Sequence, residues 1–298
     1  MKTQNLFNCL LRTTAIILTI SKIALFSACG DERPSADKGD PWPEVLEKRY
    51  GTLKALYVPA EGFAYRDAQG RLTGVTVELI RDLAAFVNKK YDIGLEIEFE
   101  EEEDWSVFYR RIVEGGDGLI GFGNVSITEE RKEELVFSPP YMNNIASIIT
   151  CRDVPELKSF EELPSTFEGM DALAFEGTLH ENRLKNLVKT YYPAADIHFA
   201  TSNDEIVERV SDNCKYFAYI DLYNYFRASK REMPLKRHSI GDDSTEQFGY
   251  IMPPGTTWDE VIELYFTHNE GLTSSDRYQN LMEKHLGKDL SSLLIDDN

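Results

Sequence analysis

The segment from Asp117 to Tyr141, DGLIGFGNVSITEERKEELVFSPPY, places a short apolar run directly before a helix start. The run Leu119–Phe122 is bounded by glycine, which predicts a buried strand. Thr128 precedes two acids and Arg131, and a threonine there caps a helix while the acids favour the positive end of its dipole. A strand that ends at a helix N-terminus brings N–H donors, small hydroxyls and a guanidinium together, which predicts an anion site. A surface turn with a solvated arginine is the alternative reading of the same spacing.

Strand and helix patterns alternate along the chain from about residue 48 to residue 288. Before the Asp117–Tyr141 segment, the expected elements are a strand at Thr52–Val58, a helix at Val75–Lys90, a strand at Leu95–Phe99 and a helix from Trp105. After it, strands are expected at 145–151, 172–175, 197–199, 216–220 and 248–252, with helices at 178–191, 203–211, from 257, and at 278–286 as the last. Such alternation predicts parallel sheets with helices on their faces, so the expected fold class is α/β.

Residues 1–29 have the pattern of an export signal, with basic residues first and a mostly apolar stretch before Cys29. The four residues 26–29, Phe-Ser-Ala-Cys, resemble a lipobox, the pattern at which a lipid chain is attached to the cysteine before cleavage. An uncleaved anchor is the alternative, but the apolar run is shorter than the ~20 residues a spanning helix needs. Residues 30–47 are polar and contain three prolines, which predicts a tether.

Composition excludes several classes of function. The chain has 298 residues, of which 42% are hydrophobic, enough for one large domain or two lobes. Its formal net charge of −19 makes nucleic acid an unsuitable partner. The sequence has no Cys-x-x-Cys pair and no histidine pair at metal spacing, so neither a metal nor another cofactor is predicted. An oxidising compartment permits a disulfide between Cys151 and Cys214, but sequence cannot place their Cα atoms within reach.

The Asp117–Tyr141 segment also contains a run of the form D-x-(apolar)-x-G, then (S/T)-I-T-x-x-R, then F-S-x-P-Y. This run resembles the signature of the bacterial extracellular solute-binding proteins of family 3, the periplasmic amino-acid-binding type. The matching residues are Asp117, Ser126, Ile127, Thr128, Arg131, Phe137, Ser138, Pro140 and Tyr141. The order of elements over residues 48–288 resembles this family as well.

The resemblance implies a two-lobe, periplasmic-binding-protein-like fold of type II, in which each lobe is a mainly parallel sheet flanked by helices. Lobe 1 is expected at 48–142 plus 253–298 and lobe 2 at 150–247. Two hinge strands, at about 143–149 and 248–252, are expected to join the lobes without a helix that braces them. Such a hinge predicts opening and closing by rigid rotation.

A free amino acid carries a carboxylate and an ammonium group, and burying both requires that each be paired. Arg131 is the predicted cation of the site, because a guanidinium binds a carboxylate through two hydrogen bonds and stays charged. The resemblance implies that Asp221, after the 216–220 strand, binds the ammonium group. The remaining predicted ligand-binding residues are Asn124, Ser126, Gly177, Thr178, His180, Phe63 and Tyr57.

Individual site residues have specific expected roles. Gly177 lets the backbone approach a ligand and Thr178 stands at a helix start, although an ordinary helix cap is the alternative. Phe63, Tyr57 and Trp105 are candidates for an apolar or stacking wall, although the pattern around Trp105 is more typical of a helix core. Leu179 stands where the family often has a hydroxyl, and Tyr57 where its basic-amino-acid binders have an acid. These two departures disfavour lysine or arginine as the ligand.

The predicted function is capture of an amino acid or related small polar acid by an extracytoplasmic lipoprotein, in a closing cleft, for ABC-type uptake. Its expected partners are the ligand, an ABC permease and a membrane that it contacts through the lipid on Cys29. The expected location is the periplasm or the cell surface. The protein is expected to be a monomer without catalytic activity. One alternative is a dehydratase-like enzyme in which Glu176 or His180 is a general acid. The other is a sensory ligand-binding module.

Overall fold

The computed structural model describes residues 37–269 and 271–295. The export signal, Cys29 and residues 30–36 of the expected tether lie outside the described residues. Residues 36–298 form one compact unit, which is described here by itself. Within the described residues, nine strands form one sheet in the order β4-β1-β5-β11-β7-β10-β8-β9, with the short β6 paired to β11.

The strands and helices have the following bounds. The strands of the large sheet are β1 (Tyr50–Tyr57), β4 (Gly94–Glu101), β5 (Leu119–Ser126), β6 (Val136–Phe137), β7 (Met142–Cys151), β8 (Asp171–Phe175), β9 (Ile197–Ala200), β10 (Tyr216–Asp221) and β11 (Leu235–Met252), and a separate hairpin consists of β2 (Tyr65–Arg66) and β3 (Leu72–Thr73). The helices are α1 (Trp42–Lys48), α2 (Val75–Tyr91), α3 (Trp105–Val113), α4 (Glu129–Lys132), η1 (Phe160–Glu162), α5 (Leu163–Thr166), α6 (Leu179–Tyr191), α7 (Asn203–Asp212), α8 (Leu222–Lys230), α9 (Asp259–Thr267), α10 (Asp276–Leu286) and α11 (Lys288–Ile295).

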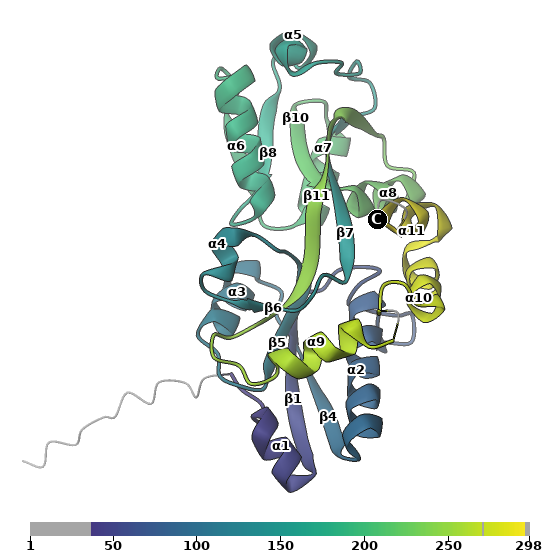
Figure 1. The fold of residues 1–298 in the computed structure, drawn as a ribbon. Coiled ribbons are helices and arrows are strands. Elements are labelled where there is room, and N and C mark those ends of the chain that lie inside the picture. The colour runs from purple at the N-terminus through teal and green to yellow at the C-terminus, as the bar shows by residue number, and fades with distance from the viewer. Residues whose placement is uncertain (1–36, 270, 296–298) are drawn as a thin grey trace, which may run out of the picture. The chain divides into compact units, whose positions relative to one another are not determined.

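The sheet is parallel at both ends and antiparallel in the middle. Strand β1 pairs in parallel with β4 and β5, and β8 pairs in parallel with β9 and β10. The two long strands β7 and β11 pair with each other in antiparallel orientation and run between these two parts (Figure 1). We call the part around β1, β4 and β5 lobe 1 and the part around β8, β9 and β10 lobe 2. The expected α/β class and two-lobe arrangement are confirmed.

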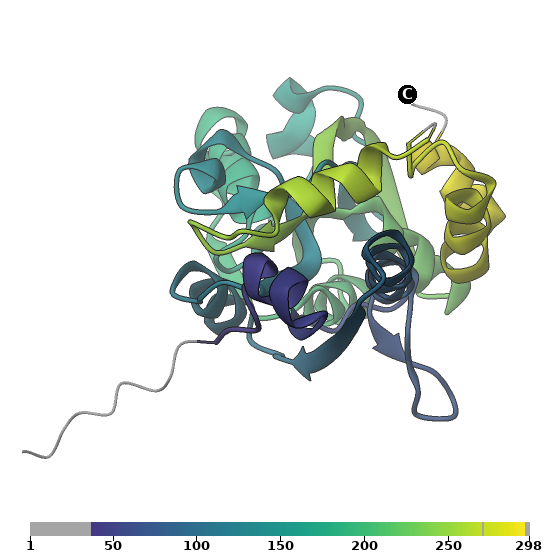
Figure 2. The ribbon, with the colours of Figure 1, turned by 60° about the horizontal axis from the view of Figure 1, so that its bottom comes forward.

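Each lobe has hydrophobic cores on both faces of its strands. In lobe 1, Leu53 of β1 faces a core that includes residues of α2 and α9, whereas Leu56 of the same strand faces a core that includes residues of α3. Figure 1 shows α2 and α3 on opposite sides of β1, and Figure 2 shows the same part of the fold after a turn of 60°. In lobe 2, Ala172 and Ala174 pack on the α6 side and Leu173 packs on the α7 side. Alternation of side chains along a strand produces this division. Strands covered on both faces are typical of parallel sheets.

The segment 37–47 is not part of a tether. Asp37 pairs with Lys54 at 2.7 Å and with Arg111 at 2.7 Å, and the amide of Gly39 donates to the carbonyl of Asp117. Residues 42–48 form α1, in which Val45 is fully buried. A proline at the start of a helix is compatible with helical geometry, so the prolines here do not break the fold. The expected tether is therefore wrong for residues 37–47.

A further helix, α11, follows the one that was expected to be the last. Gly287 ends α10 with a φ of +86°, as predicted for a helix terminus. Leu290 and Leu294 of α11 are buried in the same core as Ile145 of β7 and Leu222 of α8. Their spacing of four residues places them on one helix face. A helix therefore does pack against a crossing strand, which corrects the expectation of an unbraced hinge.

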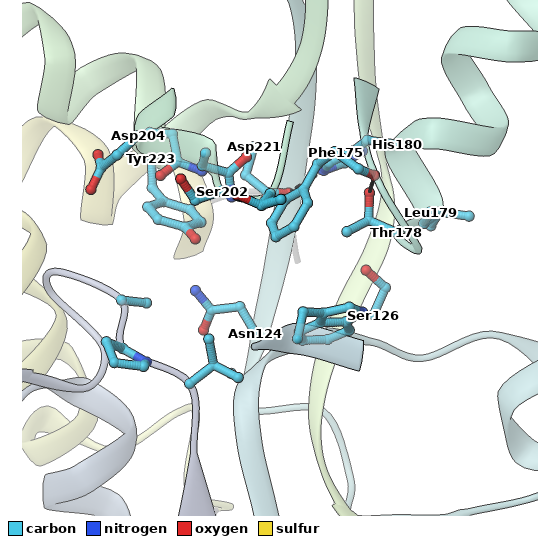
Figure 3. A pocket seen from close by; sticks show the side chains of 18 of the residues that line it. Asn124, Ser126, Phe175, Thr178, Leu179, His180, Ser202, Asp204, Asp221 and Tyr223 are labelled. Carbon is cyan, nitrogen blue, oxygen red and sulfur yellow. Dashed lines mark hydrogen bonds and ion pairs between the residues drawn. The ribbon is translucent and has the colours of Figure 1, made fainter. Parts of the chain in front are cut away.

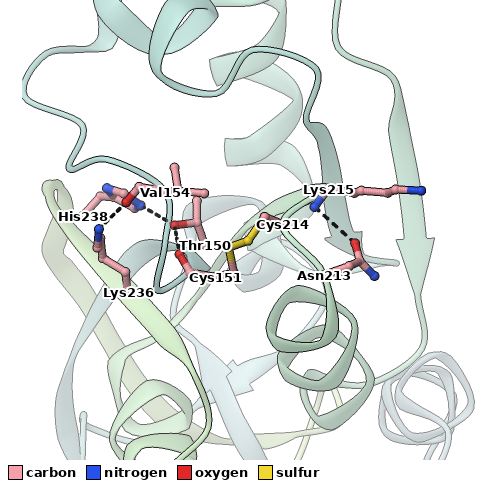
Figure 4. The surroundings of a disulfide bond; sticks show 8 residues. All are labelled: Thr150, Cys151, Val154, Asn213, Cys214, Lys215, Lys236 and His238. Carbon is pink, nitrogen blue, oxygen red and sulfur yellow. Dashed lines mark hydrogen bonds between the residues drawn. A yellow bond between two sulfur atoms is a disulfide. The ribbon is translucent and has the colours of Figure 1, made fainter.

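A disulfide joins Cys151, the last residue of β7, to Cys214, in the connection before β10 (Figure 4). The two Cα atoms lie 5.2 Å apart. Thr150 beside Cys151 hydrogen-bonds to the buried His238 of β11. The disulfide lies within lobe 2, away from the lobe boundary.

Among the described residues, no helix has the length and apolar character needed to cross a membrane.

Candidate functional site

A cavity of about 310 Å³ lies between the lobes, lined by the segments that follow the carboxyl ends of strands in both (Figure 3). Lobe 1 contributes the residues after β1, the end of β5 and Arg131 of α4, and lobe 2 contributes the β8–α6, β9–α7 and β10–α8 connections. Figure 3 shows Asp221, His180 and Thr178 on one side of the cavity and Asn124 and Ser126 on the other. Carboxyl ends of parallel strands are where open α/β sheets bind ligands.

Arg131 is a partly buried cation with no counter-ion of its own. Its Nη1 donates to the carbonyl of Ser126 at 3.0 Å, and its guanidinium lies 5.7 Å from the ring centre of Trp105 and 5.6 Å from that of Tyr109. It makes no ion pair with another described residue. Burial lowers the pKa of Arg131, because a desolvated guanidinium is less stable in its charged form. The cap expected at Thr128 holds the start of α4, since its hydroxyl accepts from the amide of Arg131 at 3.2 Å.

Asp221 is a buried carboxylate at the end of β10. The side-chain amide of Asn144 donates to its Oδ1 at 2.5 Å, and the Nε2 atom of His180 lies 2.9 Å from the same oxygen. All three side chains are buried. Neither lysine nor arginine pairs with Asp221 within the described part of the chain. The carboxylate therefore has hydrogen-bond partners but no permanently cationic one.

Asn124 and Ser126 present polar groups from the end of β5. Asn124 has a φ of +56°, in the left-handed region that asparagine tolerates better than most residues. Its Oδ1 accepts from the hydroxyl of Tyr141 at 2.9 Å, while its buried Nδ2 has no hydrogen-bond partner among the described residues. The Ser126 hydroxyl donates to Glu246 at 2.6 Å. An unpaired buried donor favours a ligand that accepts a hydrogen bond.

Three titratable residues meet at the lobe 2 wall of the cavity, where His180 and Asp221 line it and Glu246 lies close to both. His180, Asp221 and Glu246 present atoms within 4.8 Å of one another, a spacing that could hold a metal ion. Both oxygens of Glu246 are already engaged, Oε2 by the Ser126 hydroxyl and Oε1 by Arg183. We therefore interpret this group as a charge network rather than a metal centre. Sequence reasoning missed Glu246 and Arg183, because nothing in the sequence links a residue of α6 to a distant residue of β11.

The predicted residues of the β8–α6 connection lie at the cavity, with one difference. Thr178 and His180 line it, but the Thr178 hydroxyl donates to the carbonyl of Phe175 at 2.8 Å instead of capping α6. Gly177 lines a second cavity of about 410 Å³, which also includes Arg131, Thr178 and Trp105. Gly177 has a φ of +75°, a conformation that favours glycine.

Tyr57 and Phe63 do not line either of these two cavities, contrary to the prediction. Each is 1% exposed, and the Tyr57 hydroxyl donates to Glu101 at 2.5 Å. The ring of Phe63 packs edge-on against Tyr223 at 4.8 Å. Tyr57 has the same strand parity as Leu53 and so faces the core. Trp105, for which the sequence left a wall position and a helix-core position open, lines both cavities.

Other wall residues were not predicted. Tyr223, Asn224 and Arg227 of α8 line the cavity, and the buried Nδ2 of Asn224 has no hydrogen-bond partner among the described residues. Their position on the helix that follows Asp221 was the available signal. Glu176, the candidate general acid of the enzyme alternative, is exposed and lines neither of the two cavities.

Comparison with known proteins identifies relatives of this chain. Residues 54–288 match the family described as bacterial extracellular solute-binding proteins, family 3. A probable amino-acid-binding protein, YxeM, of Bacillus subtilis is 24% identical over 288 residues, which cover 93% of this chain and 96% of the relative. A probable amino-acid ABC transporter-binding protein of Haemophilus influenzae is 30% identical over 154 residues, 52% of this chain and 53% of the relative.

Solved structures show the same fold. A putative L-cystine ABC transporter protein from Listeria monocytogenes superposes with a TM-score of 0.65 at 14% identity, over 80% of this chain and 97% of that one. The fold is that of the type II periplasmic binding proteins. With the family match extending over most of the sequence, the chain belongs to the bacterial extracellular solute-binding proteins of family 3.

Proposed function

We propose that the protein captures a free amino acid, or a small polar acid with an amino group, between its two lobes and delivers it to an ABC permease. One observation carries the proposal: Arg131 from lobe 1 and Asp221 from lobe 2 line the same cavity, and neither pairs with a permanently charged side chain in the described part of the chain. An unpaired buried charge is costly, and a ligand that supplies the opposite charge removes that cost. A zwitterion supplies both charges at once.

The size of the cavity supports a ligand of this class. A volume of 310 Å³ corresponds to about ten water molecules at the density of the liquid. A single amino acid fits such a space, whereas a chain of several residues exceeds it. In the proposed complex the carboxylate lies on Arg131 with the donors near Ser126 and Thr178, and the ammonium group lies on Asp221.

The first experiment is a thermal-shift screen of the protein without residues 1–29 against amino acids and small organic acids. A ligand present at 100 times its dissociation constant stabilises the folded state by about 2.7 kcal/mol. Calorimetry with the ligand found then compares Arg131→Ala and Asp221→Asn with the wild type. Each variant is expected to fold and to lose about 2–5 kcal/mol of binding free energy, because one ligand charge is left buried and unpaired.

Lys132→Ala is the matched control, since Lys132 lies beside Arg131 on α4 but pairs with the exposed Glu129. If Arg131→Ala binds the ligand with an affinity within a factor of a few of the wild type, Arg131 does not bind the ligand's carboxylate. Unchanged affinity for Asp221→Asn would instead point to a ligand without an amine.

We also infer that the protein acts outside the cytoplasm as a monomer anchored by a lipid on Cys29. Membership of an extracellular binding family and the lipobox-like ending at residues 26–29 support this inference. Cys29→Ser is expected to leave the protein unlipidated, either soluble or uncleaved. Mass spectrometry of the wild-type protein that finds an unmodified mature N-terminus at another residue would refute lipidation.

A further inference from the structure

Strand β11 is irregular where it passes between the lobes. Its register against β7 shifts between His238 and Asp243 and again between Asp243 and Glu246. An irregularity of this kind bends a strand and increases its local twist. The second shift lies immediately before the part of β11 that pairs with β5 of lobe 1, at Phe248. The irregular part of β11 therefore lies where this strand crosses from lobe 2 to lobe 1.

Arg183 of α6 binds the acids on both sides of this second shift. Its Nη2 lies 2.8 Å from Oδ2 of Asp243, its Nη1 pairs with Oε1 of Glu246, and its guanidinium lies 5.7 Å from the ring centre of Tyr219. The Glu246 side chain is only 3% exposed, against 30% for that of Asp243. Buried ion pairs add little net stability compared with apolar packing, but they can specify one arrangement of the chain. Two carboxylates held by one planar guanidinium fix their separation.

The same contacts connect to both walls of the ligand cavity. Arg183 lies three residues after His180 in α6, so the two side chains are on one face of the helix that carries the lobe 2 wall. On the other side, Glu246 accepts from the hydroxyl of Ser126, and the Ser126 carbonyl accepts from Arg131. A continuous chain of polar contacts thus runs from Arg131 in lobe 1 through Glu246 to Arg183 in lobe 2.

We propose that Arg183 is a positioning residue for ligand capture: by pairing with Asp243 and Glu246 across the register shift, it holds β11 in the bent form that brings Arg131 and Asp221 to one cavity. Arg183 lines neither of the two cavities and acts through the crossing strand rather than on the ligand. The inference rests on the proposed function. A ligand selects this bent form because only there can it contact both lobes.

The test compares Arg183→Met with Arg209→Met in the protein without residues 1–29. Arg209 of α7 is the matched control, because it also stacks on a tyrosine, Tyr216 at 4.9 Å, and pairs with an acid, Glu205 at 3.0 Å, but lines neither cavity. With the amino acid found in the screen, Arg183→Met is expected to raise the dissociation constant about tenfold, a typical coupling between distant groups. In small-angle scattering at saturating ligand, its radius of gyration is expected to stay above that of the wild type.

Two milder variants keep the proposal testable if Arg183→Met does not fold. Glu246→Gln keeps an acceptor for Ser126 but removes the charge on one side of the register shift. Asp243→Asn removes the charge on the other side of the shift, at a more exposed position. Both are expected to weaken binding and to reduce contraction. A dissociation constant for Arg183→Met within twofold of Arg209→Met, or weaker binding with full contraction, would overturn the proposal. Absence of binding by the wild type would instead count against the proposed function.

Discussion

Burial changes the acid–base equilibrium of His238 in lobe 2. Its ring is fully buried, its Nδ1 accepts from the amide of Leu157 at 3.0 Å, and its Nε2 lies 2.7 Å from the Thr150 hydroxyl oxygen (Figure 4). That hydroxyl donates to the carbonyl of Cys151, so it accepts from Nε2. These contacts fit the neutral imidazole, and burial lowers the pKa of His238 to about 4.

The depressed pKa predicts a loss of stability at acid pH. Below about 6.5 the unfolded chain binds a proton on this histidine that the folded protein does not bind until about pH 4. The stabilisation is therefore complete above pH 6.5 and is lost as the pH falls towards 4. Between pH 7 and pH 5 the contribution to the free energy of unfolding should fall by about 2 kcal/mol, at 1.36 kcal/mol per pKa unit.

Urea unfolding at pH 7 and pH 5 measures this loss. His238→Gln keeps one acceptor and one donor but cannot titrate, so its unfolding free energy should fall less over the same interval. His198→Gln serves as the control because the His198 side chain, which lies 3.1 Å from Asp171, is 42% exposed rather than buried. Equal pH dependence in wild type and His238→Gln would show that other groups cause the acid sensitivity.

Sequence reasoning at the residue scale brought Arg131 and Asp221 to the same cavity, because each lies at or shortly after the carboxyl end of a strand. Their binding roles stay predictions. The prediction for Tyr57 is wrong because successive side chains of a strand point to opposite sides. The residue type alone does not show whether Tyr57 points to the core or to the cavity. Glu246 and Arg183 meet only through tertiary packing, which no local pattern encodes.

At the scale of elements, the alternating pattern predicted most of the strands and helices of both lobes, but it missed helix α8 and residues 235–247 of β11. Two further errors lie at the ends of the described chain. The segment 37–47 was assigned to a tether on its prolines and polarity, yet Asp37 and Val45 attach it to lobe 1 through charge pairing and burial. The helix α11 was missed because Gly287 is a strong terminus signal, although a new helix begins at the next residue.

Strands β7 and β11, which cross between the lobes, and helix α11 connect lobe 1 to lobe 2. Strands β7 and β11 pair along most of their lengths, and α11 adds an apolar contact on β7 through Leu290 and Leu294. The register shifts of β11 interrupt this otherwise regular ladder. Regular pairing resists bending while an irregular segment permits it, so the bend is expected at residues 238–246 rather than uniformly along the crossing strands.

For the whole molecule, the lobes meet on both sides of the ligand cavity. On one side, Phe63 packs against Tyr223, and Glu61 lies 3.4 Å from Arg227. On the other side, Gly177 lies opposite Trp105 and Ser106, where a side chain's first carbon would come within 3.6 Å of the Ser106 hydroxyl and 3.7 Å of the Trp105 ring. These contacts flank the cavity. Under the proposed function, a ligand that contacts both Arg131 and Asp221 favours the arrangement in which the lobes approach each other.

The most direct test of this account is small-angle scattering of the wild-type protein without residues 1–29 as an amino acid ligand is added. The radius of gyration should fall on saturation while the helix signal in circular dichroism stays constant, because closure rotates the lobes without changing their interiors. The carboxamide of the same amino acid lacks the charge that Arg131 is proposed to bind, and at the same concentration it should cause no contraction. A radius that does not change at saturating amino acid would contradict a closing cleft and would favour a rigid pocket within one lobe.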